Sequence, residues 1–158
     1  MLYYAYDAYS SMAHKRKPIR QEDPFGCGIA CVAYVSHVSY RTAMARYFKS
    51  RNGAATGGYP CRDLVDALAR SGRKYAYRRV RGRNRLENGS IVFIKRSARY
   101  PSGHYLVKAA SGWIDPWINF SAKTPNIKSS KAGIRKRLPG KPMYAISEAH
   151  AANTLKLQ

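Results

Sequence analysis

Residues 21–39, QEDPFGCGIACVAYVSHVS, decide the fold that we expect for this chain. A polar turn with Pro24 and Gly26 leads into an apolar segment that begins at Cys27. Small and apolar residues recur at helical spacing and would form one face of a helix, and further apolar residues occupy its other faces. This pattern is typical of a helix buried at the centre of a domain. We therefore predict a core helix over roughly residues 26–38, with Cys27 at its N-terminal end.

The position of Cys27 suits a nucleophile. The first N–H groups of a helix lack intrahelical partners, and the positive end of the helix dipole favours a thiolate beside it. Reactive cysteines are often found at such positions. Cys27 is therefore our candidate nucleophile, and this role requires a base and a group that orients the base elsewhere in the chain.

The composition limits the class of protein. The chain has 158 residues, of which 45% are hydrophobic, and this suits one folded domain rather than a wholly disordered protein. Its 29 Lys and Arg against 8 Asp and Glu give a formal charge of +21, which favours anionic partners such as acidic peptides, nucleic acid or an anionic surface. Three cysteines do not form a complete disulfide set, so we expect a reducing compartment or one free thiol.

The sequence also carries expectations about location. No apolar run approaches the roughly 20 residues that a transmembrane helix needs. The N-terminus lacks the basic and then apolar pattern of a signal peptide. We therefore expect no transmembrane segment and favour the cytoplasm, with export by a route independent of a signal peptide as the alternative. The oligomeric state stays open.

The order of the expected elements indicates an α+β domain. Helical spacing predicts two further helices, at residues 40–50 and 61–70, with a glycine-rich loop at 52–60 between them. The pattern then changes to that of strands, so we expect N-terminal helices packed on a mainly antiparallel sheet. The strands are expected at residues 75–80, 91–95, 104–109, 112–114 and 143–146.

The domain is expected at residues 20–148, between an N-terminal arm at 1–19 and a C-terminal tail at 149–158. Residues 121–141 are rich in Lys, Ser, Pro and Gly and show little periodicity. We predict a long surface loop there, with a short helix near Ile134.

His104 and Asp115 are the two residues that can serve Cys27. A tight hairpin is predicted around residues 110–112, so residues on its two arms come side by side. Asp115 ends the second arm, and Pro116 stops that strand from continuing. A thiol becomes an efficient acyl-transfer nucleophile when an imidazole handles its proton and a carboxylate orients the imidazole.

A third requirement is a set of donors for the oxyanion that forms on the attacked carbonyl group. The backbone N–H of Cys27 can supply one donor. Gln21, which lies across the turn from Cys27, can supply a side-chain amide as another. This mechanism requires no metal ion and no organic cofactor.

Three motifs occur in order along the chain. They are Gln21-x5-Cys27-Gly28-x-Ala30-Cys31, Gly103-His104-Tyr105-Leu106-Val107 and Trp113-Ile114-Asp115-Pro116. Together they resemble the C39 family of papain-like cysteine peptidases, over roughly residues 20–147. The resemblance implies a papain-like fold and hydrolysis of a peptide or protein substrate. It also implies site roles: Cys27 as nucleophile, His104 as base, Asp115 as its orienting residue and Gln21 as oxyanion residue.

Two other functions remain open from the sequence. The same triad supports a glutamine deamidase or transglutaminase, by resemblance to papain-like bacterial toxins and effectors. From a different class, residues 73–85 combine many cations with Tyr75 and Tyr77, and such surfaces bind single-stranded nucleic acid. In that case the triad has no catalytic role. The alternation is more typical of a strand with one solvated basic face, so nucleic acid is not favoured.

The remaining cysteines and His37 are interpreted as structural. Cys31 lies one helical turn beyond Cys27, and Cys61 has no histidine assigned to it. His37 is expected to be a core histidine of the first helix. A zinc site built from these residues and Cys27 would leave His104 and Asp115 unexplained, so it is not favoured.

Overall fold

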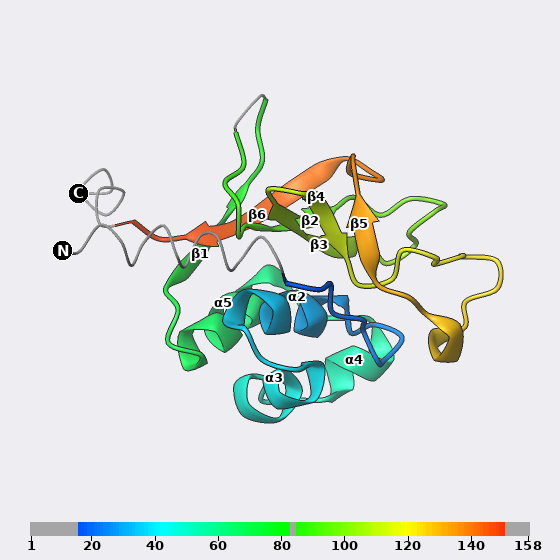
Figure 1. Cartoon of the computed structure of the whole chain (residues 1–158), viewed down its shortest axis with the longest axis horizontal. Coiled ribbons are helices and arrows are strands. Elements are labelled where there is room, and N and C mark those ends of the chain that lie inside the picture. Colours follow the sequence, from blue (N-terminus) through cyan, green and yellow to red (C-terminus); the bar gives the residue numbers. More distant parts are fainter. Residues whose placement is uncertain (1–15, 83–84, 151–158) are drawn as a thin grey trace.

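The computed structural model describes residues 16–82 and 85–150. Helices form one layer, and a six-stranded sheet lies against them (Figure 1). Every strand pairing in this sheet is antiparallel, which confirms the expected α+β class. The helices are α2 (Cys27–Ser36), α3 (Tyr40–Tyr47), α4 (Asn52–Thr56), α5 (Cys61–Arg70) and the 3-10 helix η1 (Ile127–Ser129).

Helix α2 is the centre of the fold. It lies between α3 on one side and β3 (His104–Ala109) on the other (Figure 1). Its residues Ile29, Val32 and Ala33 are all fully buried, because each side of the helix meets another apolar surface. The predicted core helix and its start at Cys27 are therefore confirmed.

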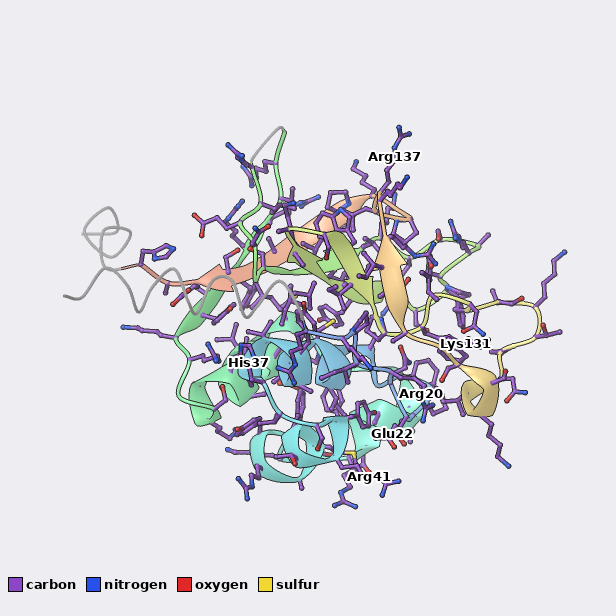
Figure 2. The ribbon with its side chains drawn as sticks, viewed as in Figure 1. Arg20, Glu22, His37, Arg41, Lys131 and Arg137 are labelled. Atoms are coloured by element: carbon purple, nitrogen blue, oxygen red, sulfur yellow. The ribbon has the colours of Figure 1, made fainter. Side chains whose placement is uncertain are left out.

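The C-terminal end of α2 corrects one expectation. His37 is not a core histidine: the helix ends at Ser36, and His37 is an exposed C-cap in the left-handed conformation, with φ of 58°. Figure 2 shows His37 at this end of the helix. A left-handed cap turns the chain out of the helix, so the helical spacing that continues to Val38 no longer describes a helix face.

The first described residues pack against the same helix end. The Arg16 guanidinium donates hydrogen bonds to the carbonyl groups of Tyr34, at 2.6 Å, and Val38, at 2.9 Å. A cation is favourable there because the last carbonyl groups of a helix lack intrahelical partners. Residues 16–19 of the predicted arm thus contact the domain, whereas residues 1–15 of the arm and 151–158 of the predicted tail lie outside the described residues.

Helix α5 packs closely on α2 because Gly28 has no side chain. A Cβ atom at Gly28 would lie 3.0 Å from Cδ1 of Leu64, which is tighter than normal van der Waals contact. Leu64 and Leu68 of α5 are fully buried in the core that the helices share with the sheet. This contact keeps α5 in place beside the N-terminal half of α2.

The sheet has apolar residues on both faces. Tyr105 and Val107 of β3 belong to the main core under the helices, whereas Leu106 belongs to a second cluster with Ile94 and Tyr100. This division follows from the alternation of side chains along a strand. The strand order is β1-β6-β2-β3-β4-β5. The other strands are β1 (Tyr75–Arg79), β2 (Ile91–Ile94), β4 (Gly112–Asp115), β5 (Gly133–Arg135) and β6 (Pro142–Glu148).

Three local expectations need correction. The helix predicted near Ile134 is wrong, because this residue lies in the strand β5, which pairs with β4 at the edge of the sheet. The predicted loop at 52–60 contains the short helix α4 before its glycines, and α3 ends at Tyr47 rather than Ser50. Strand β5 has only three residues, too few for periodicity to reveal, and its pairing partner is distant in the sequence.

None of the helices within the described ranges has both the length and the hydropathy that crossing a bilayer requires.

We expect Leu64→Ala to lower the free energy of unfolding by about 2–5 kcal/mol, because it opens a cavity between α5 and α2. Ile134→Ala removes an aliphatic side chain that is 46% exposed and should cost less than about 1 kcal/mol. Urea denaturation of the two variants beside the wild type measures both changes. Equal losses would contradict the central role given to the α2–α5 contact.

Candidate active site

His104 is the first residue of β3, and the glycine before it determines how the chain enters the strand. Gly103 has φ of 70°, and its N–H donates to the carbonyl of Tyr100 at 2.9 Å in a tight turn. A Cβ atom on Gly103 would collide with the ring of Phe93, so the turn requires glycine. The turn places the imidazole at the end of the sheet that lies near the start of α2.

The β3–β4 hairpin brings His104 to Asp115. The two strands pair through Val107 with Ile114, so Asp115 stands diagonally across from His104. Residues in diagonal positions are within reach when one side chain is long. The His104 Nε2–H donates to Asp115 Oδ1 at 2.7 Å, as the hairpin predicted. Since Nε2 is occupied, Nδ1 is the ring nitrogen left for another partner.

Asp115 has two further donors and no contact with solvent. The Arg135 Nε–H donates to Oδ2 at 2.6 Å, and the backbone N–H of Trp117 donates to Oδ1 at 2.9 Å. Burial by itself raises the pKa of Asp115, but the bonds and charge from His104, with those of Arg135 and Trp117, bring it down to about 2. The carboxylate is therefore ionised at neutral pH, although it is fully buried.

The imidazole of His104 is held on its flat face as well as at its edge. The Tyr100 ring stacks on it, with centroids 5.1 Å apart and an angle of 10° between the planes. Burial by itself lowers the pKa of His104, but the hydrogen bond to Asp115 and the interaction with the Cys27 thiol outweigh it and raise the pKa to about 9. The site thus favours an imidazolium between a carboxylate and a thiol.

Cys27 lies at the N-terminal end of α2, as the sequence predicted, and the interaction of its thiol with the imidazole is one of the causes that raise the His104 pKa. Its thiol and the imidazole both line one pocket of about 260 Å³ between the helices and the end of the sheet. Seven aromatic residues line the same pocket, so a bound carbonyl group would be partly shielded from water. The lining aromatic residues are Phe25, Tyr59, Phe93, Tyr100, Tyr105, Trp117 and Phe120.

Gln21 lines the same pocket and is almost fully buried. Its side-chain Nε2 donates to the carbonyl groups of Asp23, at 3.0 Å, and Pro24, at 3.2 Å, while Oε1 has no hydrogen-bond partner among the described residues. These bonds hold the turn that precedes Cys27. Gln21 therefore lies where the sequence placed it, and donation of its amide to a substrate oxygen stays a prediction.

The other two thiols differ from Cys27 in their surroundings. Cys31 is 1% exposed, and burial raises its pKa well above the ordinary value. Cys61 is half-buried, and burial raises its pKa also, with the Tyr105 hydroxyl 3.6 Å from its sulfur. Across residues 16–82 and 85–150 no group of three or more His, Cys, Asp or Glu side chains could hold a metal ion.

Sequence reasoning missed Arg135 and Tyr100. Arg135 lies in the stretch predicted as a surface loop, yet it contacts Asp115 and also donates to the Ile118 carbonyl at 2.9 Å. Tyr100 is 2% exposed and lies between the rings of His104 and Phe120. The sequence offered one signal for Arg135. A buried carboxylate needs a cationic partner, and this chain has many cations for few acids.

Comparison with protein-family models, with curated proteins and with solved structures finds no match to this chain.

Alkylation should modify Cys27 first. With iodoacetamide near pH 7, we expect Cys27 to react at least about 10-fold faster than Cys31 or Cys61, because it lines the pocket beside a histidine that can hold its proton. Peptide mapping by mass spectrometry over time measures the three rates. Faster labelling of Cys61 would contradict the assignment of the nucleophile.

The raised pKa of His104 also predicts how stability depends on pH. A raised pKa in the folded state adds stability that is complete below the unfolded value of about 6.5 and is lost as the pH rises towards 9. Asp115→Asn removes the anion that raises this pKa, so the difference in stability between wild type and variant should shrink by about 1–3 kcal/mol over that interval.

Denaturation curves of both proteins from pH 6 to pH 10 measure this difference. Glu22→Gln, which alters an ion pair of a highly exposed Arg41, serves as the control and should give a difference that does not change over the same interval. Parallel pH profiles for wild type and Asp115→Asn would contradict the imidazolium–carboxylate pair.

Proposed function

We propose that this protein is a papain-like cysteine peptidase that hydrolyses peptide bonds with Cys27, His104 and Asp115. The observation that carries the proposal is the buried 2.7 Å hydrogen bond from His104 Nε2 to Asp115, which leaves Nδ1 for the thiol at the start of α2. The resemblance of the surrounding motifs to the C39 family supports the same reading. An antiparallel sheet packed against a central helix that begins with the nucleophile also agrees with a papain-like fold.

The reaction follows from the positions of these groups. The Cys27 thiolate attacks the carbonyl carbon of the scissile amide, and the resulting oxyanion accepts hydrogen bonds from N–H groups at the start of α2. The His104 imidazolium then gives its proton to the leaving nitrogen, so the C–N bond breaks and a thioester remains on Cys27. Asp115 stabilises the imidazolium and keeps its orientation without taking the proton.

Water completes the cycle, and His104 now acts as a base instead of an acid. His104, now neutral, accepts a proton from a water molecule that attacks the thioester carbonyl. Collapse of this second intermediate breaks the C–S bond and releases the acid product and the Cys27 thiolate, while His104 is again an imidazolium. The steps balance without a metal ion, an oxidant or an organic cofactor.

The triad is tested by turnover of a peptide library. Cys27→Ala should abolish cleavage, and Asp115→Asn should reduce kcat/KM by about 10–10³-fold, because the imidazole loses the anion that orients it. Cys31→Ala makes the same change at a buried thiol of α2 that lines neither the candidate active-site pocket nor the cavity beside it, and it should keep most of the activity. Circular dichroism verifies that each variant is folded.

Mass spectrometry of the products separates the proposal from its rivals. Hydrolysis splits the peptide and adds one water across the two fragments, whereas deamidation of glutamine leaves the peptide intact and about 1 Da heavier. Intact, heavier peptides would contradict the peptidase and indicate a deamidase. Full cleavage by Cys27→Ala would contradict the whole mechanism.

A further inference from the structure

A second cavity, of about 570 Å³, lies next to the candidate active-site pocket. The two have six lining residues in common, so they lie side by side. The shared lining residues are Gly57, Gly58, Tyr59, Phe93, Ser102 and Tyr105. An extended peptide bound at Cys27 would therefore place a neighbouring side chain in this second cavity.

The floor of the second cavity is aromatic. Phe93 of β2 pairs with Tyr105 of β3 on one side and with Tyr144 of β6 on the other, so the three rings share one face of the sheet. Tyr77 of β1 also lines the cavity. Such a surface packs well against the methylene groups of a long side chain.

Two arginines lie at the cavity, Arg62 in the first turn of α5 and Arg96 just after β2. Both are exposed, and in the part of the chain that the structure describes neither has a hydrogen-bond or ion-pair partner. Asp63, the acid nearest to Arg62 in sequence, lines a different pocket with Asp66. The two guanidinium groups are therefore free to bind an anion from outside the protein.

We propose that this second cavity is a specificity subsite that binds the acidic side chain of a peptide substrate, preferably glutamate. The inference depends on the proposed peptidase function, because it assigns a substrate class to that same site. Arginine pairs well with carboxylates through parallel hydrogen bonds, and the positive end of α5 adds to the attraction. The aromatic floor packs against the methylene groups of glutamate, and aspartate has one methylene group fewer to make this contact.

The test uses a library of internally quenched peptides in which Glu, Gln or Lys is placed at each position around the scissile bond. The wild type should cleave peptides with Glu faster than those with Gln at one position near the scissile bond. Arg62→Gln combined with Arg96→Gln should lower this Glu:Gln ratio of kcat/KM by about 5–20-fold, while cleavage of the Gln peptides changes little.

The matched control removes two charges elsewhere. Lys136→Gln combined with Arg137→Gln makes the same change in net charge at exposed residues outside the cavity, and Figure 2 shows Arg137 pointing away from the sheet. This control should keep the Glu:Gln ratio. If both double variants lower the ratio equally, the preference comes from the overall charge and the subsite is overturned.

A binding experiment separates the subsite from the peptidase function. Fluorescence anisotropy with Cys27→Ala compares labelled Glu and Gln peptides, with and without the two arginine substitutions. If the wild type cleaves no peptide, the peptidase proposal fails. Tighter binding of Glu peptides that depends on Arg62 and Arg96 would still support the subsite.

Two results would overturn the subsite while leaving the peptidase intact. They are cleavage without any Glu preference and a preference that survives in the arginine double variant.

Discussion

A carboxylate that is fully removed from water must be paired, and Asp115 meets this requirement through three different elements. His104 comes from β3, Arg135 from β5, and the Trp117 N–H from the chain just after β4. Loss of any one donor would leave part of a buried charge uncompensated, which costs several kcal/mol. The ends of three neighbouring strands are thus held in one arrangement, and the imidazole orientation depends on it.

The candidate nucleophile comes from the other layer. Cys27 lies on a helix that is packed on nearly every side, and the contact of α2 with β3 sets the distance between thiol and imidazole. A site built across two rigid elements needs little reorganisation during a reaction. Tyr100 adds to this rigidity, because its ring stacks on His104 and is itself backed by Phe120. The pocket opens where the two layers meet, which exposes the thiol while the carboxylate stays covered.

The excess of positive charge has different consequences in different places. Several of the few acids are already engaged, as Asp23 with the Tyr40 hydroxyl and Glu22 with Arg41. On the edge strand β1, exposed arginines discourage pairing with another sheet, which gives the basic stretch around Tyr77 a structural explanation. Figure 2 shows Arg41 and Arg137 on opposite sides of the molecule, so the cations are not confined to one surface. Arginines that line a cavity beside the candidate site are the ones positioned to select a ligand.

Local sequence patterns were sufficient for the core helix, for most strands and for the hairpin that joins His104 to Asp115. The reason is that each of these depends on periodicity or turn residues within a short segment. Only the tertiary structure decided that Ile134 lies in a strand, that Arg135 binds Asp115 and that the two pockets share part of their lining. These features depend on pairing and packing between segments far apart in the chain. Such contacts produce no periodic pattern in the sequence of either segment. The sequence by itself thus determined which residues could perform the chemistry, whereas the packing of helices on the sheet decided which of them meet.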